Sequence, residues 1–289
     1  MFLLKMNIAQ FLLKACQLHP DRSAVSVGSK TLYTYRSMYE RVRDLAASMT
    51  YDMNLSPGDR VAIVMPNHPE YLVIRYAAWF AGLSVVPINA KLHVLEIEYM
   101  LEHSGSKICF VSSSLQGELL LKPGQVEIID VDCVRYQNMT NVGQEIEMVE
   151  MQPDALAWLF YTSGTTGKPK GVMITHHNML IGAMTYLVDV DCISAKDTII
   201  HAAPLSHGSG FYDLPHVLRC ANQVIPASGQ FNPSEILDLI QNWHGVTMFL
   251  APTMIKRLVQ SQQVTQCPLE GLKTVVYGGG PMYVQDIKR

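Results

Sequence analysis

The eleven residues YTSGTTGKPKG, 161–171, decide how the rest of the chain is interpreted. Apolar runs stand on either side, 155–160 before and 172–174 after, which predicts a strand, a loop and a second strand. Three glycines give the loop backbone freedom to turn and to approach a ligand closely. Its N–H groups and its Ser and Thr hydroxyls can cradle phosphate oxygens, while two lysines supply positive charge. The stretch therefore predicts a loop that binds a polyphosphate.

This loop differs from the phosphate loop of P-loop ATPases and kinases, whose pattern is G-x-x-x-x-G-K-[ST]. Gly164 and Gly167 are too close together for that pattern, and Pro169 stands where its magnesium-binding Ser or Thr would be. The order of residues closely resembles the signature loop of the adenylate-forming superfamily: acyl-CoA synthetases, aryl-CoA ligases, luciferases and the adenylation domains of peptide synthetases. The plainer alternative, a surface linker rich in Gly, Ser and Thr, rarely carries this order between two apolar strands.

In that family the loop holds the β- and γ-phosphates of ATP while a carboxylate attacks the α-phosphate. The resemblance therefore implies contacts with ATP for eight residues, and it places Mg²⁺ beside one of them, Thr166. The eight are Thr162, Ser163, Gly164, Thr165, Thr166, Gly167, Lys168 and Lys170. Three further stretches, 32–49, 57–72 and 81–92, look like the N-terminal part of an acyl-CoA synthetase, so the similarity runs nearly end to end.

Composition and charge favour a globular protein that acts on small molecules. Of the 289 residues, 48% are hydrophobic and 16% are charged, which supplies a core and excludes a disordered chain. The net charge is −3 without a basic run, so nucleic acid is not expected as a main partner. The six cysteines are scattered without the spacing of a zinc site, which predicts reduced thiols in a cytoplasmic protein.

The pattern of apolar runs predicts an α/β fold with largely parallel sheets. The first 15 residues are too short and too polar for a signal peptide or a membrane span, and predict an amphipathic helix. Residues 24–33 predict a β-hairpin, after which short β-branched runs alternate with helices, as crossover connections require. Residues 132–153 have weak periodicity and predict a surface connection. By resemblance alone, 55–190 would form one α/β sub-lobe, and 1–54 with 191–289 the other.

A second chemical stretch, PLSHGSG at 204–210, carries an imidazole on a glycine-rich loop. By itself His207 would be interpreted as a hydrogen-bonded loop residue. Similar synthetases have this histidine beside the acyl carboxylate, which implies that His207 orients or polarises the acyl group. It is not expected to act as an obligate base, because a carboxylate needs no deprotonation at pH 7.

A third stretch, VVYGGGPM at 275–282, predicts a strand that ends in bare backbone against which a flat ring can lie. Pro281 is predicted at the first position of the following helix. By resemblance, the adenine would lie on Gly278, Gly279, Gly280 and Pro281, and the acyl pocket would be formed by His207, Gly208, Thr253 and Gly279. Asn67 and His176 stand at predicted helix starts and are interpreted as structural.

These features favour an AMP-forming carboxylic acid:CoA ligase that activates a fatty or aryl acid, with ATP, Mg²⁺ and coenzyme A. Amino-acid adenylation domains carry a Phe-Asp pair near residue 207, where this chain has Leu-Ser-His, and this disfavours an amino acid. A luciferase, a fatty-acyl-AMP ligase and a carrier protein as acyl acceptor stay open.

The alternative from another class is a non-catalytic remnant that binds nucleotide. By resemblance, family members continue with a Tyr-Gly-x-Thr-Glu segment, an Asp for the ribose and a small C-terminal domain with a catalytic Lys. None of these follows Pro281, so we expect that the 289 residues alone do not complete the reaction. Uncovered apolar surface would then favour a homodimer.

Overall fold

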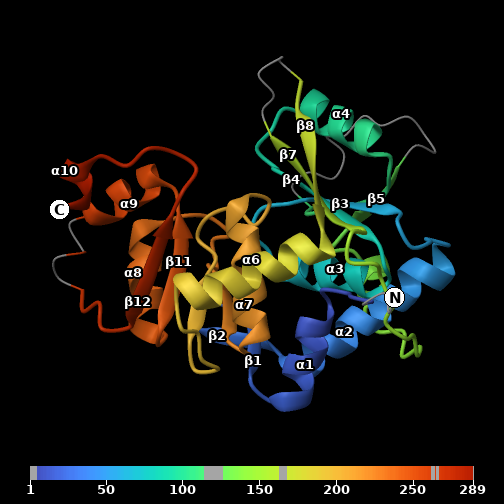
Figure 1. Cartoon of the computed structure of the whole chain (residues 1–289), viewed down its shortest axis with the longest axis horizontal. Helices are drawn as coiled ribbons and strands as arrows, with labels where there is room; N and C mark the ends of the chain where they lie inside the picture. Colours follow the sequence, from blue (N-terminus) through green and yellow to red (C-terminus); the bar gives the residue numbers. More distant parts are fainter. Residues whose placement is uncertain (1–4, 114–125, 163–167, 262–263, 265–266, 289) are drawn as a thin grey trace. The chain divides into compact units, whose positions relative to one another are not determined.

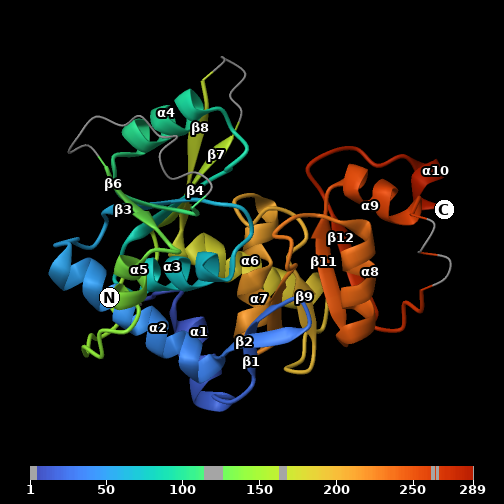
Figure 2. The same ribbon diagram turned by 180° about the vertical axis from the view of Figure 1, so that it is seen from behind.

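A computed structural model of the chain describes residues 5–113, 126–162, 168–261, 264 and 267–288. Its contacts divide the chain into two units, the first made of Met1–Lys14 with Ser37–Gly182 and the second of Ala15–Arg36 with Ala183–Arg289. The boundaries fall inside three helices, which are α1 (Gln10–Leu18), α2 (Tyr35–Ala47) and α6 (His176–Asp189). Figures 1 and 2 present the same ribbon from opposite sides.

In the described part of the first unit, six strands form a sheet in the order β6-β5-β3-β4-β7-β8. Neighbouring strands run parallel except β7 and β8, which are antiparallel. The strands are β3 (Arg60–Val64), β4 (Ser84–Ile88), β5 (Ser106–Val111), β6 (Glu127–Asp130), β7 (Leu156–Thr162) and β8 (Lys170–Thr175). The helices between them are α3 (Pro69–Phe80), α4 (Val94–Ser104) and α5 (Val134–Met139), and a π-helical turn, Ser48–Asp52, follows α2.

Alternation of side chains along these strands places helices on both faces of the first sheet. One face packs against α4, with a core of Ala62, Val64, Val86, Ile88, Cys109 and Val111 against Ile97, Met100 and Leu101. Phe110 points to the other face, where its ring meets Tyr136 of α5 with 5.9 Å between centroids. In Figures 1 and 2, α4 and α3 lie on opposite sides of this sheet.

In the described part of the second unit, six strands form a sheet in the order β12-β11-β9-β10-β1-β2. Neighbours are parallel except in the hairpin β1–β2, where Gly28 turns the chain at φ +59°. The strands are β1 (Ser23–Val27), β2 (Lys30–Thr34), β9 (Thr198–Ile200), β10 (Asn222–Ile225), β11 (Val246–Leu250) and β12 (Leu272–Tyr277). The helices are α7 (Asp213–Leu218), α8 (Pro233–Asn242), α9 (Pro252–Val259) and α10 (Val284–Ile287), with a 3-10 turn at Gly208–Phe211.

The core of the second unit lies between its sheet and α8. Pro233 opens this helix behind an Asn232 cap, whose side chain accepts from the Ser234 N–H. Its apolar positions, Ile236, Leu237 and Ile240, then fall on one face, as a 3.6-residue period requires. They pack against strand residues that include Val224, Val246, Met248 and Leu250.

The predicted α/β class with mostly parallel sheets is confirmed, as are the β1–β2 hairpin and the amphipathic first helix, whose Phe11, Leu12 and Ala15 are buried. Residues 37–54 group with the first unit, and the Arg41–Glu70 ion pair at 3.1 Å joins them to α3 there. Whether the units act as the two sub-lobes of an active site stays a prediction.

Two local predictions are wrong. Residues 132–153 contain α5, whose Tyr136 and Met139 are buried, and six residues are too few for a helical period to show. Pro281 is not the first helical residue, because α10 begins at Val284 behind a Tyr283 cap. Within the described residues, no helix is both long and apolar enough to cross a bilayer.

Candidate functional site

The predicted phosphate loop connects the two antiparallel strands β7 and β8. The two expected strands are confirmed, although β8 begins at Lys170, two residues earlier than predicted. Thr162 and Lys170 are register partners at the base of the loop, and both are exposed, as is Lys168. The other predicted phosphate ligands, Ser163, Gly164, Thr165, Thr166 and Gly167, lie outside the described residues.

Close packing explains why residue 171 is a glycine, and the sequence did not reveal this packing. It lies in β8 opposite Tyr161, and a Cβ there would stand 2.9 Å from Cδ1 of Leu159 and 3.4 Å from Cζ of Tyr161. The two side chains therefore cross directly over the glycine backbone. This fixes Tyr161 at the entrance to the loop.

The base of the loop also meets α4, which sequence reasoning missed. The Tyr161 hydroxyl lies 2.7 Å from Nδ1 of His103, and the Tyr99 ring stacks on His103 with 5.3 Å between centroids. The ammonium of Lys168 stands over the Tyr99 ring, 5.6 Å from its centroid. Tyr99 and His103 are four residues apart, a spacing that predicts side chains on the same face of a helix. No local sequence pattern indicates that this face lies beside the loop.

In the second unit, the carboxyl ends of β11 and β12 carry the predicted glycine turn. Gly278 is half-buried, and a Cβ there would stand 3.2 Å from the ring of Phe249. Gly279 has φ +80°, a conformation that favours glycine, and no atom of the described residues stands within 4 Å of its Cβ position. Gly280 faces only Pro252, at 4.0 Å. Bare backbone is therefore exposed at this turn, and the contact of adenine with it stays a prediction.

Phe249 joins this turn to the second predicted stretch. The Cβ position of Gly208 lies 3.8 Å from Cζ of Phe249, so the same ring is next to both Gly208 and Gly278. Tyr212 stacks on the ring at 4.8 Å and 22°, and Tyr186 meets Tyr212 edge-on at 5.4 Å. Sequence reasoning missed Phe249, although the last residues of a parallel strand are the usual place for ligand contacts.

The remaining predicted residues lie near this group. Thr253 and Pro281 are both exposed, Thr253 on the first turn of α9, directly after Pro252. His207 is the residue before the 3-10 turn, and its Nδ1 lies 3.0 Å from Oγ of Ser206. Desolvation lowers the pKa of His207, and a backbone hydrogen bond with Ser206 opposes this only in part. The ring is therefore neutral at pH 7, which suits orientation of a substrate better than charge neutralisation.

His176 and Asn67, interpreted from the sequence as structural, are both buried in the described chain. His176 is buried at the start of α6, where its Nδ1 accepts a hydrogen bond from the Ile8 N–H at 3.1 Å. Burial lowers the pKa of His176 to about 4, so it stays neutral. Asn67 is buried and precedes the α3 cap His68.

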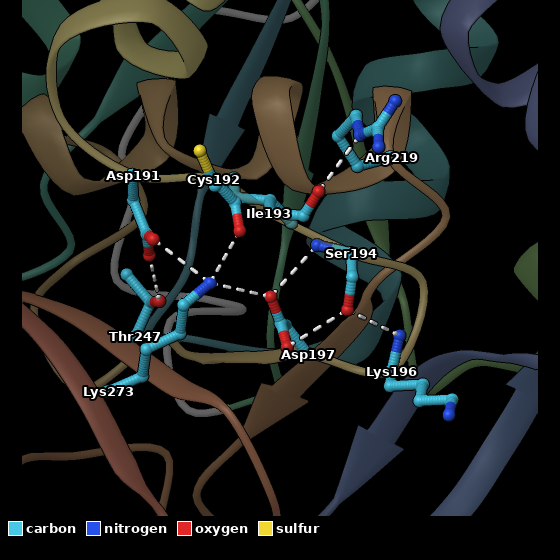
Figure 3. Close-up of polar contacts among 9 residues, drawn as sticks. All are labelled: Asp191, Cys192, Ile193, Ser194, Lys196, Asp197, Arg219, Thr247 and Lys273. Atoms are coloured by element: carbon cyan, nitrogen blue, oxygen red, sulfur yellow. Dashed lines mark hydrogen bonds and ion pairs between the residues drawn. The ribbon is translucent and has the colours of Figure 1, made fainter.

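The opposite ends of β9, β11 and β12 hold a polar cluster that fixes the segment before β9 (Figure 3). The ammonium of Lys273 lies 2.9 Å from Asp191 Oδ1, 2.8 Å from Asp197 Oδ2 and 2.6 Å from the Cys192 carbonyl oxygen. Thr247 of β11 donates to Asp191 at 3.2 Å. The cluster lies at the amino ends of these strands, whereas Phe249 and Gly278 lie at the carboxyl ends.

Several of the described residues offer groups that fit ATP and its Mg²⁺. Lys168, Lys170 and Thr162 offer cations and a hydroxyl, and the open turn at Gly279 and Gly280 offers backbone that a Cβ would cover. Within the part of the chain that the structure describes, no three His, Cys, Asp or Glu side chains gather as metal ligands. Mg²⁺ carried by a nucleotide takes most of its ligands from phosphates and water, so a site of this kind needs no such cluster.

Comparison with known proteins gives a consistent picture. Residues 12–289 match the family model described as AMP-binding enzyme. The chain is 30% identical over 280 residues to a feruloyl-CoA synthase from Amycolatopsis sp. This alignment covers 93% of this chain and 53% of that protein. It thus spans about half the length of the curated proteins that it matches.

Two solved structures resemble the chain closely. O-succinylbenzoate coenzyme A synthetase from Bacillus subtilis, in complex with AMP, gives a TM-score of 0.85 at 29% identity, covering 98% of this chain and 56% of that one. The inhibitor-bound N-terminal domain of FACL13 from Mycobacterium tuberculosis gives a TM-score of 0.86 at 25% identity. The match covers 98% of this chain and 72% of that one.

Proposed function

The chain belongs to the AMP-binding enzyme family, and from this we propose that it is the nucleotide-binding part of an AMP-forming carboxylic acid:CoA ligase. The observation that carries the proposal is the order YTSGTTGKPKG on the β7–β8 hairpin, with Thr162 and Lys170 paired at its base. The CoA-ligase names of the feruloyl and succinylbenzoate relatives support the reaction class.

In the proposed reaction, a carboxylate oxygen attacks the α-phosphorus of ATP, the bond to the bridging oxygen breaks, and pyrophosphate leaves. The CoA sulfur then attacks the acyl carbon, the bond to the AMP oxygen breaks, and the thiol proton passes to solvent. Lys168 and Lys170 neutralise the leaving pyrophosphate, and neutral His207 orients the acyl carboxylate. Mg²⁺, when bound, neutralises further phosphate charge. Catalysis of this kind rests on positioning and charge rather than on a covalent step by the protein.

Phe249 supports an aromatic acid over a fatty acid as the substrate. Its ring stands next to Gly208 and Gly278, and Tyr212 stacks on the ring. A flat acyl group against glycine backbone gains edge or face contact with Phe249, worth about 0.5–1.5 kcal/mol beyond area burial. The feruloyl and succinylbenzoate relatives are named for acids that carry a ring.

The test combines nucleotide binding by the purified chain with pyrophosphate exchange by a complete ligase that contains it, assayed with a panel of aryl and fatty acids. Lys170→Ala together with Thr165→Ala should lower exchange at least about tenfold, equivalent to about 1.4 kcal/mol. Lys30→Ala, at an exposed residue of the β1–β2 hairpin, serves as the control and should leave exchange unchanged. An unchanged rate in the double variant would remove the loop assignment.

The outcome also separates the proposal from the non-catalytic alternative. A remnant that only binds nucleotide would bind ATP and AMP without acid-dependent exchange. Exchange that depends only on fatty acids would retain the ligase but reject the aromatic substrate. Exchange stimulated by amino acids would favour an adenylation domain, which the Leu-Ser-His sequence at 205–207 disfavours.

A further inference from the structure

The last two turns of α4 form a rigid surface beside the base of the loop. The helix begins with a capping box, in which the His93 side chain accepts a backbone N–H and the Glu96 carboxylate accepts from the His93 N–H. It ends at Gly105, φ +61°, where the Arg60 guanidinium donates to the carbonyl oxygens of Ser104 and Gly105. Both ends are therefore fixed, and the core residues described above hold the helix on the sheet.

Tyr99 and His103 project from this helix as a stacked pair. Their spacing of four residues brings the rings onto one face, with 29° between their planes. Tyr161 completes the pair from β7 through its hydroxyl at Nδ1 of His103. Burial raises the pKa of Tyr161 to about 12, with Tyr99 adding to the effect, so the hydroxyl keeps its proton at pH 7 and can donate it to Nδ1 of His103. Tyr161 thus fixes the orientation of the His103 ring, and His103 supports Tyr99.

Lys168, at the C-terminal end of the loop, lies over the same surface of α4. Its Nζ lies 5.6 Å from the centroid of the Tyr99 ring, within the range of a cation–π interaction. An ammonium on a ring face directs only part of its N–H bonds at the ring. The remaining N–H bonds can donate to a phosphate at the same time.

We propose that Tyr99 and His103 are positioning residues that hold the ammonium of Lys168 ready for the terminal phosphates of ATP. The inference rests on the proposed function, because it requires that the loop binds those phosphates. A lysine that is already held loses less side-chain freedom when the ligand arrives, so nucleotide affinity rises without a new contact to the ligand. AMP lacks the terminal phosphates, and its affinity should not depend on Tyr99.

Calorimetric dissociation constants for ATP and for AMP test this directly. Tyr99→Leu should weaken ATP binding about two- to fivefold, equivalent to about 0.4–1 kcal/mol, and leave AMP binding unchanged. Tyr99→Phe keeps a ring face and should recover most of the ATP affinity. Tyr51→Leu, at an exposed tyrosine of the π-helical turn, is the matched control and should change neither constant. If Tyr99→Leu does not fold by circular dichroism, Tyr161→Phe, which removes one hydroxyl, should weaken ATP binding in the same sense.

A double-mutant cycle with Lys168→Met identifies the route of the effect. In the Lys168→Met background, Tyr99→Leu should have no further effect on ATP binding. An equal loss in both backgrounds, or equal losses for ATP and AMP, would show a general packing role and overturn the inference. An unchanged ATP affinity in Lys168→Met would overturn it as well, while the Lys170 result would still uphold the phosphate loop. If the wild-type protein binds neither nucleotide, it is the proposed function that fails.

Discussion

The ammonium of Lys273 lies 2.8 Å from Oδ2 of Asp197, which ties the second residue of β12 to the segment that leads into β9 (Figure 3). The register of β11 and β12 explains why the Lys273 side chain can reach Asp197. Val246 pairs with Leu272 and Thr247 with Thr274, so Lys273 is the extra residue of a β-bulge. A bulge redirects side chains, and here Lys273 turns toward the face where Thr247 contacts Asp191.

Replacing this lysine should destabilise the second unit. Its side chain is 32% exposed, whereas those of Asp191 and Asp197 are only 7% and 13% exposed, so Lys273→Met leaves two largely buried carboxylates without their cation. We expect a loss of about 1–3 kcal/mol in unfolding free energy, between the values for surface pairs and fully buried pairs. Urea denaturation measures it. Lys196→Met in the same segment is the control, because its side chain points away from the cluster, and an equal loss there would contradict the assignment.

The contribution of this cluster should disappear in acid. Burial by itself raises the pKa of Asp197, but hydrogen bonds from Lys273 and Ser194 outweigh it and lower the pKa. A carboxyl whose folded pKa lies below its unfolded value of about 3.9 stabilises the fold above that value. This contribution is lost as the pH falls through the lowered pKa. The difference in unfolding free energy between wild type and Asp197→Asn should therefore be full at pH 7 and shrink below about pH 4. A difference that stays constant down to pH 3 would contradict this.

These relationships mark the limit of what the sequence predicts. Local patterns sufficed for the hairpin predicted over 24–33, whose strands are observed at Ser23–Val27 and Lys30–Thr34, because two short β-branched runs around a turn glycine are local signals. The loop at 161–171 was found because its residue types are contiguous. Lys273 meets partners some 80 residues earlier, and Phe249 meets glycines in two other segments. Such contacts depend on sheet order, which no local pattern encodes.

Gly278 and Phe249 should behave as a coupled pair. A methyl group at 278 would stand 3.2 Å from two atoms of the Phe249 ring, so Gly278→Ala must displace that ring. We expect weaker binding of aromatic acids in Gly278→Ala, and only partial recovery when Phe249→Leu is added, because the smaller side chain removes the crowding and also the ring contact with the acid. Competition binding with a ladder of aryl acids measures both variants. Full recovery in the double variant would show that the ring does not contact the ligand and would contradict the proposed aromatic substrate.

The glycine turn offers a separate test of the acyl wall. Gly279 is unsuitable for it, because φ +80° strains any L side chain placed there whatever the space. Gly280 has no such constraint, and only Pro252 stands near its Cβ position. Gly280→Trp should therefore project an indole from an undisturbed turn and exclude bulky acids while sparing short ones. Equal loss for acids of every size would place the acyl group elsewhere.

His207 should titrate below its reference value and act through its neutral form. Desolvation lowers its pKa, so the midpoint of its ring proton shift by NMR should lie below about 6.5. If the neutral ring orients the acyl carboxylate, kcat/KM for adenylation should rise with pH through that midpoint and stay flat above pH 7. His207→Ala should remove this acidic limb and lower kcat/KM by roughly 10- to 100-fold, equivalent to the ~1.5–3 kcal/mol of a hydrogen bond to a charged group. His177→Ala, at an exposed histidine of α6, provides the control for loss of an imidazole. An acidic limb that survives in His207→Ala would assign the titration to another group and leave His207 as a loop residue held by Ser206.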